Sequence, residues 1–82
     1  MKRVIRKEKK MVGCFIDLEL KTAEASAELV KYVVEVDEQP LIEDSFITIG
    51  IRKELKEVMK IIEKLTNFKE IDTIRIEMVP IS

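Results

Sequence analysis

The stretch from Val12 to Leu20 alternates between two sets of residues, and this alternation constrains the fold more than any other feature. One set is Val12, Cys14, Ile16, Leu18 and Leu20, and the other is Gly13, Phe15, Asp17 and Glu19. Successive side chains of a β-strand point to opposite faces, so the pattern predicts a half-buried strand. Such a strand needs a second layer of structure over its apolar face.

Two later segments alternate in the same way. Residues 45–51 place Ile47, Ile49 and Ile51 on one face, with Phe46, Thr48 and Gly50 on the other. Residues 73–79 place Ile74, Ile76 and Met78 on one face, with Arg75 and Glu77 on the other. Both segments are predicted to be strands, and Pro80 is expected to end the last one because proline cannot donate to a ladder.

The segment between these two strands has helical periodicity. Its apolar residues recur at intervals of three and four, which is typical of an amphipathic helix. They are Leu55, Val58, Met59, Ile62 and Leu65. Asn67 is predicted to end this helix in a left-handed conformation, which asparagine tolerates.

The region from Thr22 to Asp44 is ambiguous. Thr22 is a plausible helix N-cap, and a broad apolar surface follows it on the expected helix. Residues 31–36 fit either the end of that helix or a separate strand, because their β-branched residues also alternate with charged ones. Residues 37–44 carry four acids and Pro40 and are expected to form the main loop.

Both interpretations of residues 31–36 give one α+β domain spanning residues 1–82. If they form a strand, the order is βαββαβ, a ferredoxin-like plait with two helices on one face of an antiparallel sheet. If they do not, residues 2–8 could pair as an N-terminal hairpin, which gives ββαβαβ. Independently of this choice, residues 1–10 are expected to be a basic N-terminal arm or an edge-strand extension.

The composition excludes an intrinsically disordered chain. Hydrophobic residues make up 46% and charged residues 38%, yet the net charge is only −1, whereas disorder goes with low hydrophobicity and high net charge. The charge is unevenly distributed: residues 1–10 hold six cations and one anion, and residues 17–44 hold nine anions and two cations. Abundant Lys and Glu with few amides predict a heat-adapted (thermophile) source.

Catalytic chemistry is not expected. The chain has no histidine, its one cysteine is at an inward strand position, and none of the predicted strands has a carboxylate on its inward face. We therefore predict no catalytic residues, no metal site, no cofactor and no enzyme activity. Asp17 ends the only apolar run near the N-terminus, so we expect a cytoplasmic protein without a membrane partner.

The outward faces of the strands hold the candidate interaction residues. Phe15, Phe46, Thr48 and Arg75 would share the sheet face that no helix covers. Exposed phenylalanines form a costly patch, so a second subunit or the domain's own terminus is the expected cover. Together with the apolar first helix, this predicts a non-catalytic homo-oligomer, most simply a homodimer, or a subunit of a protein complex.

Two other functions remain open from the sequence. RNA-recognition motifs carry aromatics on the corresponding strands, so Phe15 and Phe46 could stack on nucleic acid bases. The basic arm could then hold the phosphates through Lys2, Arg3, Arg6, Lys7, Lys9 and Lys10. Against this, Asp17 and Glu19 would repel phosphates. By analogy with paired plaits, a small-molecule-sensing domain is the third hypothesis.

Overall fold

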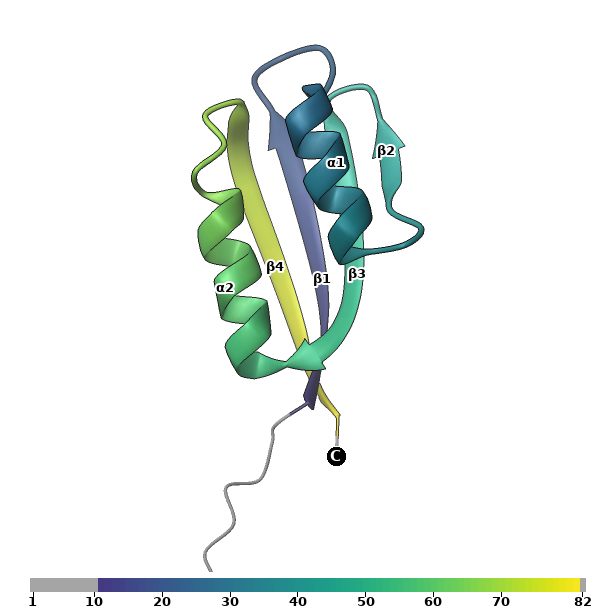
Figure 1. Ribbon diagram of the computed structural model, residues 1–82, viewed down its shortest axis with the longest axis vertical. Coiled ribbons are helices and arrows are strands. Elements are labelled where there is room, and N and C mark those ends of the chain that lie inside the picture. The colour runs from purple at the N-terminus through teal and green to yellow at the C-terminus, as the bar shows by residue number, and fades with distance from the viewer. Residues whose placement is uncertain (1–10, 82) are drawn as a thin grey trace, which may run out of the picture.

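The computed structural model describes residues 11–81 and contains a four-stranded antiparallel sheet with two helices on one face (Figure 1). Its elements are, in order, β1 (Met11–Leu20), α1 (Ala27–Val36), β2 (Leu41–Glu43), β3 (Phe46–Glu54), α2 (Leu55–Leu65) and β4 (Ile71–Ile81). The strands lie side by side in the order β2-β3-β1-β4. The predicted α+β class is confirmed. The basic arm and the hairpin of the alternative topology fall outside the described residues.

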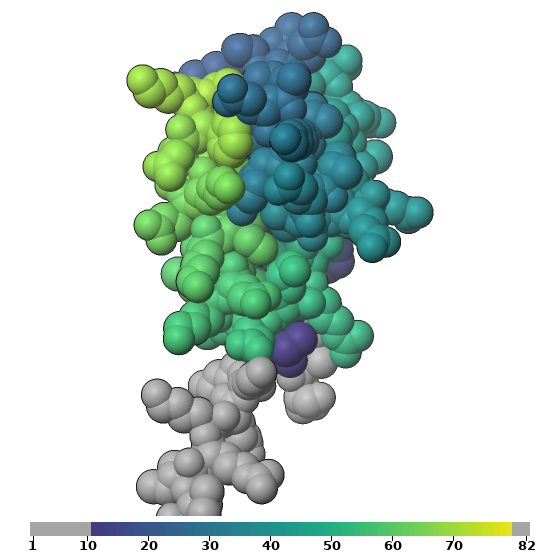
Figure 2. Space-filling model, viewed as in Figure 1, coloured from purple at the N-terminus to yellow at the C-terminus, as the bar shows by residue number. Residues whose placement is uncertain are grey.

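The core lies between the helices and the sheet face that they cover. The alternation in β1 is confirmed, because each of its inward residues is at most 9% exposed. The buried residues are Val12, Cys14, Ile16, Leu18 and Leu20 on β1; Ile47, Ile49 and Ile51 on β3; Leu29 and Val33 on α1; and Val58, Ile61 and Leu65 on α2. Seen from the helix side, α1 and α2 cover most of the sheet (Figure 2).

Helix α1 begins later than the sequence suggested. Ser26, not Thr22, is the N-cap, and its hydroxyl accepts a hydrogen bond from the Leu29 N–H at 3.2 Å. The helix continues through Val36, so the strand interpretation of residues 31–36 is wrong. Leu29 and Val33 explain this, since they lie one helical turn apart and both are 0% exposed against the sheet. The apolar surface is also narrower than predicted, because residues 23–26 precede the helix.

The second strand lies within the segment predicted to be a loop. β2 forms a tight hairpin with β3, in which Glu43 pairs with Phe46 and Ile42 with Ile47. Asp44 makes the turn possible by adopting φ 47°, a left-handed conformation that aspartate tolerates better than most residues. Three residues are too short for an alternating pattern to stand out, which is why the prediction failed.

Helix α2 confirms the predicted periodicity with two corrections. Ile61 belongs to the core, whereas Met59 is 53% exposed. The helix ends at Leu65, and its C-cap Thr66 is right-handed, at φ −64° and ψ −17°. Asn67 therefore does not form the predicted left-handed cap. Instead its N–H donates to the Lys64 carbonyl, which tightens the last turn.

Strand β4 runs past its predicted end. Pro80 does not end it and instead pairs with Val12, which is permitted because β4 is an edge strand. Ile76 and Met78 lie on the helix side of the sheet as predicted, opposite Ile16 and Cys14. They nevertheless stay 39% exposed each, since no further strand lies beyond β4 in the described chain.

Aromatic contacts join α2 and the segment after it to α1. The rings of Tyr32 and Phe68 stack with centroids 6.0 Å apart, and the Lys64 ammonium lies 4.6 Å from the centre of the Tyr32 ring. Burial, with a smaller contribution from Glu35, raises the pKa of Tyr32 above 10.0, its ordinary value.

Among the residues described, no helix has both the length and the apolar character needed to cross a bilayer.

Candidate functional site

Within residues 11–81, no element covers the sheet face opposite the helices, and we call this the open face. The register of the strands assigns its residues, because side chains at paired positions point to the same side. They are Met11, Gly13, Phe15, Asp17 and Glu19 on β1; Leu41 and Glu43 on β2; Phe46, Thr48, Gly50, Arg52 and Glu54 on β3; and Thr73, Arg75, Glu77 and Val79 on β4. This is the surface on which the sequence placed its candidate interaction residues.

Large apolar side chains on the open face are half exposed. Leu41 is 59% exposed, Phe46 56%, Phe15 54%, Val79 48% and Met11 39%. They come from all four strands, so apolar area is spread over the whole face. A folded chain that leaves this much apolar side-chain area on one face is typical of proteins with an interaction surface.

The Phe15 ring packs against Gly50 on the neighbouring strand. Phe15 pairs with Gly50 on β3, and its ring lies over the glycine, where a Cβ would come within 3.3 Å of the Phe15 Cε1. An aromatic ring that covers a cross-strand glycine shields the exposed backbone and compensates for the missing side chain. The missing side chain of Gly50 therefore leaves the space in the middle of β3 against which the Phe15 ring packs.

Phe15 and Phe46 do not form a continuous stacking platform. Phe46 pairs with Glu19, four positions along β1 from Phe15. At about 3.3 Å per residue the two rings are separated by roughly 13 Å along the strands. Two carboxylates on the same face of β1 interrupt the aromatic surface: Asp17 lies between the two positions, and Glu19 lies beside Phe46.

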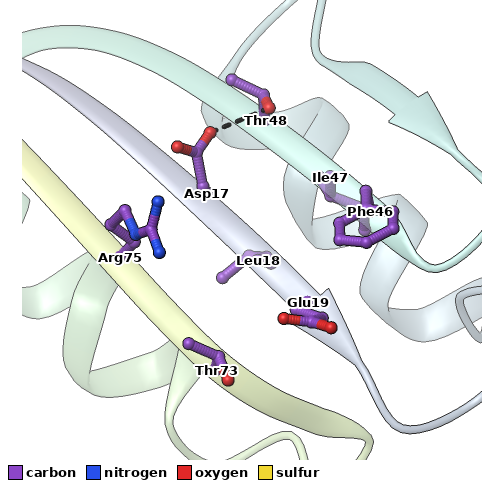
Figure 3. Close-up of a pocket in the computed structure, with 8 residues that line it drawn as sticks. All are labelled: Asp17, Leu18, Glu19, Phe46, Ile47, Thr48, Thr73 and Arg75. Atoms are coloured by element: carbon purple, nitrogen blue, oxygen red, sulfur yellow. Dashed lines mark hydrogen bonds between the residues drawn. The ribbon is translucent and has the colours of Figure 1, made fainter.

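The other three candidate residues meet around one depression of about 230 Å³. Phe46, Thr48 and Arg75 line it, together with Asp17, Leu18, Glu19, Ile47 and Thr73. The Thr48 hydroxyl donates to Asp17 Oδ1 at 2.9 Å, and the Arg75 guanidinium extends from β4 toward β1 (Figure 3). The depression is a polar centre in the open face with one aromatic wall.

The sequence did not identify the two sheet edges as distinct. On the β2 side, Asp37 Oδ2 accepts a hydrogen bond at 2.9 Å from the Gly50 N–H, beyond the end of the short strand β2. On the other side, β4 is eleven residues long. The edge on the β2 side is thus covered by a carboxylate. The only sequence signal for the long edge strand on the other side is the alternation of residues 71–81 and their number.

The groups considered for chemistry are placed as follows. Cys14 is buried, and burial raises the pKa of its thiol above 9.0, the ordinary value, so the nucleophilic thiolate is disfavoured. Across residues 11–81, no three His, Cys, Asp or Glu side chains are grouped closely enough to hold a metal ion.

Comparisons of the chain with models of protein families, with curated proteins and with solved structures gave no significant match.

Proposed function

We propose that this chain is a non-catalytic interaction module that acts as a homo-oligomer, with the open face covered by a second copy. The observation that carries the proposal is a sheet face that nothing in the described part of the chain covers, on which five large apolar side chains are 39–59% exposed. Burying such side chains stabilises association by about 25 cal/mol per Å² of apolar surface removed from water, before the cost of association is subtracted.

The size of the open face suits this role. β1, β3 and β4 have 10, 9 and 11 residues, which at about 3.3 Å per residue and about 4.8 Å between strands gives a face roughly 30 Å long and 15 Å wide. The side chains make the accessible area larger than that of a flat rectangle, and β2 adds to it. The resulting area is of the same order as the roughly 800 Å² that each partner contributes to a standard interface.

We also infer that the fold is a ferredoxin-like plait. The βαββαβ order, the central position of β1 and β3, and the placement of both helices on one face support this assignment (Figure 1). In this arrangement the open face is the natural docking surface, because the helices leave it free.

The charges on the open face favour a protein over a nucleic acid. Among residues 11–81, seven ionisable residues occupy it: the acids Asp17, Glu19, Glu43, Glu54 and Glu77, and the cations Arg52 and Arg75. A phosphate backbone would meet more acids than bases there, and its binding depends on cations. The depression beside Arg75 is the feature that a small-molecule ligand would use.

The test is the mass of the full chain in solution, measured by size-exclusion chromatography with light scattering. We expect more than one copy, and we expect Phe15→Ser with Phe46→Ser to reduce the number. Lys56→Ser, on the exposed side of α2, is the matched control and should leave the mass unchanged. A wild-type chain that stays monomeric at high micromolar concentration would overturn the proposal.

A further inference from the structure

The free edge of β4 differs from the opposite edge of the sheet. On the β2 side, the edge strand has three residues, and the Asp37 carboxylate accepts a hydrogen bond from the Gly50 N–H beyond it. Short edge strands and charged groups at an edge discourage pairing with another chain. β4 has eleven residues, and within the described chain no strand pairs with its outer side.

The hydrogen bond at Gly50 also fixes which groups β4 presents outward. Because the Gly50 N–H points toward Asp37, its β1 partner Phe15 directs its backbone groups toward β4. Phe15 pairs with Glu77, so Glu77 faces β1. Backbone groups alternate in direction along a strand, so those of Ile74, Ile76 and Met78 point to the free edge.

We propose that β4 is the contact through which a second copy of this chain is bound, by antiparallel pairing of β4 with β4 around a two-fold axis at Ile76. This inference rests on the proposed homo-oligomeric function and names the surface and the register. Ile76 would pair with Ile76 of the second copy, and Ile74 with its Met78. Pro80, at an outward position and without an N–H, ends the shared ladder.

Charge complementarity favours this register over the two adjacent ones. With the axis at Ile76, Arg75 of each copy lies opposite Glu77 of the other, at a position where the pair exchanges no backbone hydrogen bonds and side chains are closest. Moving the axis to residue 75 would place Arg75 opposite Arg75. Moving it to residue 77 would place Glu77 opposite Glu77. Both alternatives bring like charges together.

Apolar side chains line the same edge on the helix side of the sheet. Ile76 and Met78 are each 39% exposed there, because no strand of residues 11–81 lies beyond β4. Met59, 53% exposed, lies on the flank of α2 turned away from α1, because Glu57 and Lys64 occupy the flank that faces Tyr32. A second copy would cover these side chains and form one eight-stranded sheet.

The decisive experiment uses two charge reversals in the full chain. Arg75→Glu alone and Glu77→Arg alone place like charges across the axis, so each should raise the dissociation constant of the edge contact by roughly 10- to 100-fold. Mixed in equal amounts, the two variants restore both opposite-charge pairs and should form a heterodimer with near wild-type affinity, measured by analytical ultracentrifugation. No restoration on mixing would overturn the proposed register.

Ile76→Pro tests the backbone pairing separately. It removes an N–H that the folded monomer does not use, at the same kind of outward position that Pro80 already occupies, so circular dichroism should show an intact fold. Association through the edge should be lost, whereas the matched variant Ile76→Val should associate normally. Unchanged association of Ile76→Pro would overturn the edge contact.

The edge and open-face proposals fail in different ways. An oligomer that is insensitive to Ile76→Pro but reduced by the Phe15/Phe46 double variant contradicts the edge contact and leaves the open-face contact standing, because Ile76 lies on the helix side of the sheet whereas Arg75 and Glu77 lie on the open face. The reverse result contradicts the open-face contact and leaves the edge contact standing. If Ile76→Pro and the Phe15/Phe46 double variant each halve the mass of the oligomer, both contacts are supported. A monomeric wild type contradicts both contacts.

Discussion

The carboxylate of Glu70 accepts two hydrogen bonds from Ser26, one from its backbone N–H at 2.8 Å and one from its hydroxyl at 2.6 Å. Ser26 is the N-cap of α1, and Glu70 immediately precedes β4. A residue 44 positions away therefore orients the cap hydroxyl and places negative charge at the helix N-terminus, where the helix dipole favours it. The start of α1 is fixed by tertiary structure, which is why the sequence pattern indicated Thr22 instead of Ser26.

Glu70→Ala should lower the free energy of unfolding by about 1–2 kcal/mol, because the Ser26 N–H loses its partner and the cap loses its orientation. Urea denaturation with circular dichroism measures this. Glu70→Gln is the matched control: its amide keeps one acceptor oxygen and should lose less. If Glu70→Ala and Ser26→Ala were fully additive in the double variant, the coupling between the two residues would be contradicted.

The contact between Phe15 and Gly50 predicts a substitution whose effect depends on its background. In the wild type, Gly50→Ala should gain nothing or destabilise, because its Cβ would come within 3.3 Å of the Phe15 ring. In a Phe15→Ala chain, the same substitution should stabilise by about 0.5 kcal/mol, since alanine is better than glycine in a strand. Equal effects in both backgrounds, measured by denaturation at one chain concentration, would contradict the ring-over-glycine packing.

The long alternating strands could be predicted from the sequence because each buries one continuous face. The nine-residue pattern of β1 allowed only one choice of inward residues, and the structure confirms it. Residues 31–36 were undecided because valines suit both a helix and a strand. The position of Leu29 and Val33 against the sheet resolves the choice, and that contact exists only in the folded chain.

The candidate site was predictable in part for the same reason. Strand alternation placed Phe46, Thr48 and Arg75 on one face, but it could not show that they line a common depression, since that requires the register between strands. Phe15 was placed on the correct face. Its separation from Phe46 depends on the register between β1 and β3, in which Phe15 pairs with Gly50, and the sequence does not give that register. The asymmetry of the two sheet edges depends on the short strand β2, which the sequence did not reveal.

The Asp37 carboxylate accepts hydrogen bonds from the backbone N–H groups of Gln39 and Gly50, and it is expected to protect the Gly50 amide from exchange. Asp37→Ala removes the acceptor of the Gly50 N–H, so hydrogen exchange at Gly50 should accelerate and stability should fall by about 1 kcal/mol. The amide of Ile49, which faces β1 in the ladder with Ile16, is the internal control and should change only as much as global stability does. Unchanged protection at Gly50 would show that the carboxylate is not its partner in solution.

The buried Cys14 and the partly buried Tyr32 predict a loss of stability in alkali. The pKa values of Cys14 and Tyr32 are both raised by burial, above their ordinary values of 9.0 and 10.0. The folded state therefore holds these protons more tightly than the unfolded state does. Their contribution is fully present below about pH 9, where both states are protonated, and is lost as the pH rises through the raised values.

Denaturation midpoints measured from about pH 7 to about pH 11 should show this decline, and Cys14→Ala with Tyr32→Phe should flatten it. Tyr32→Phe keeps a ring for the contacts with Phe68 and Lys64, so the double variant differs mainly by the small cavity at Cys14, which lowers stability equally at every pH. Deprotonating lysines affect both chains alike, so the difference between the two curves isolates the contribution of Cys14 and Tyr32. Parallel curves throughout this range would show that neither group titrates differently on folding.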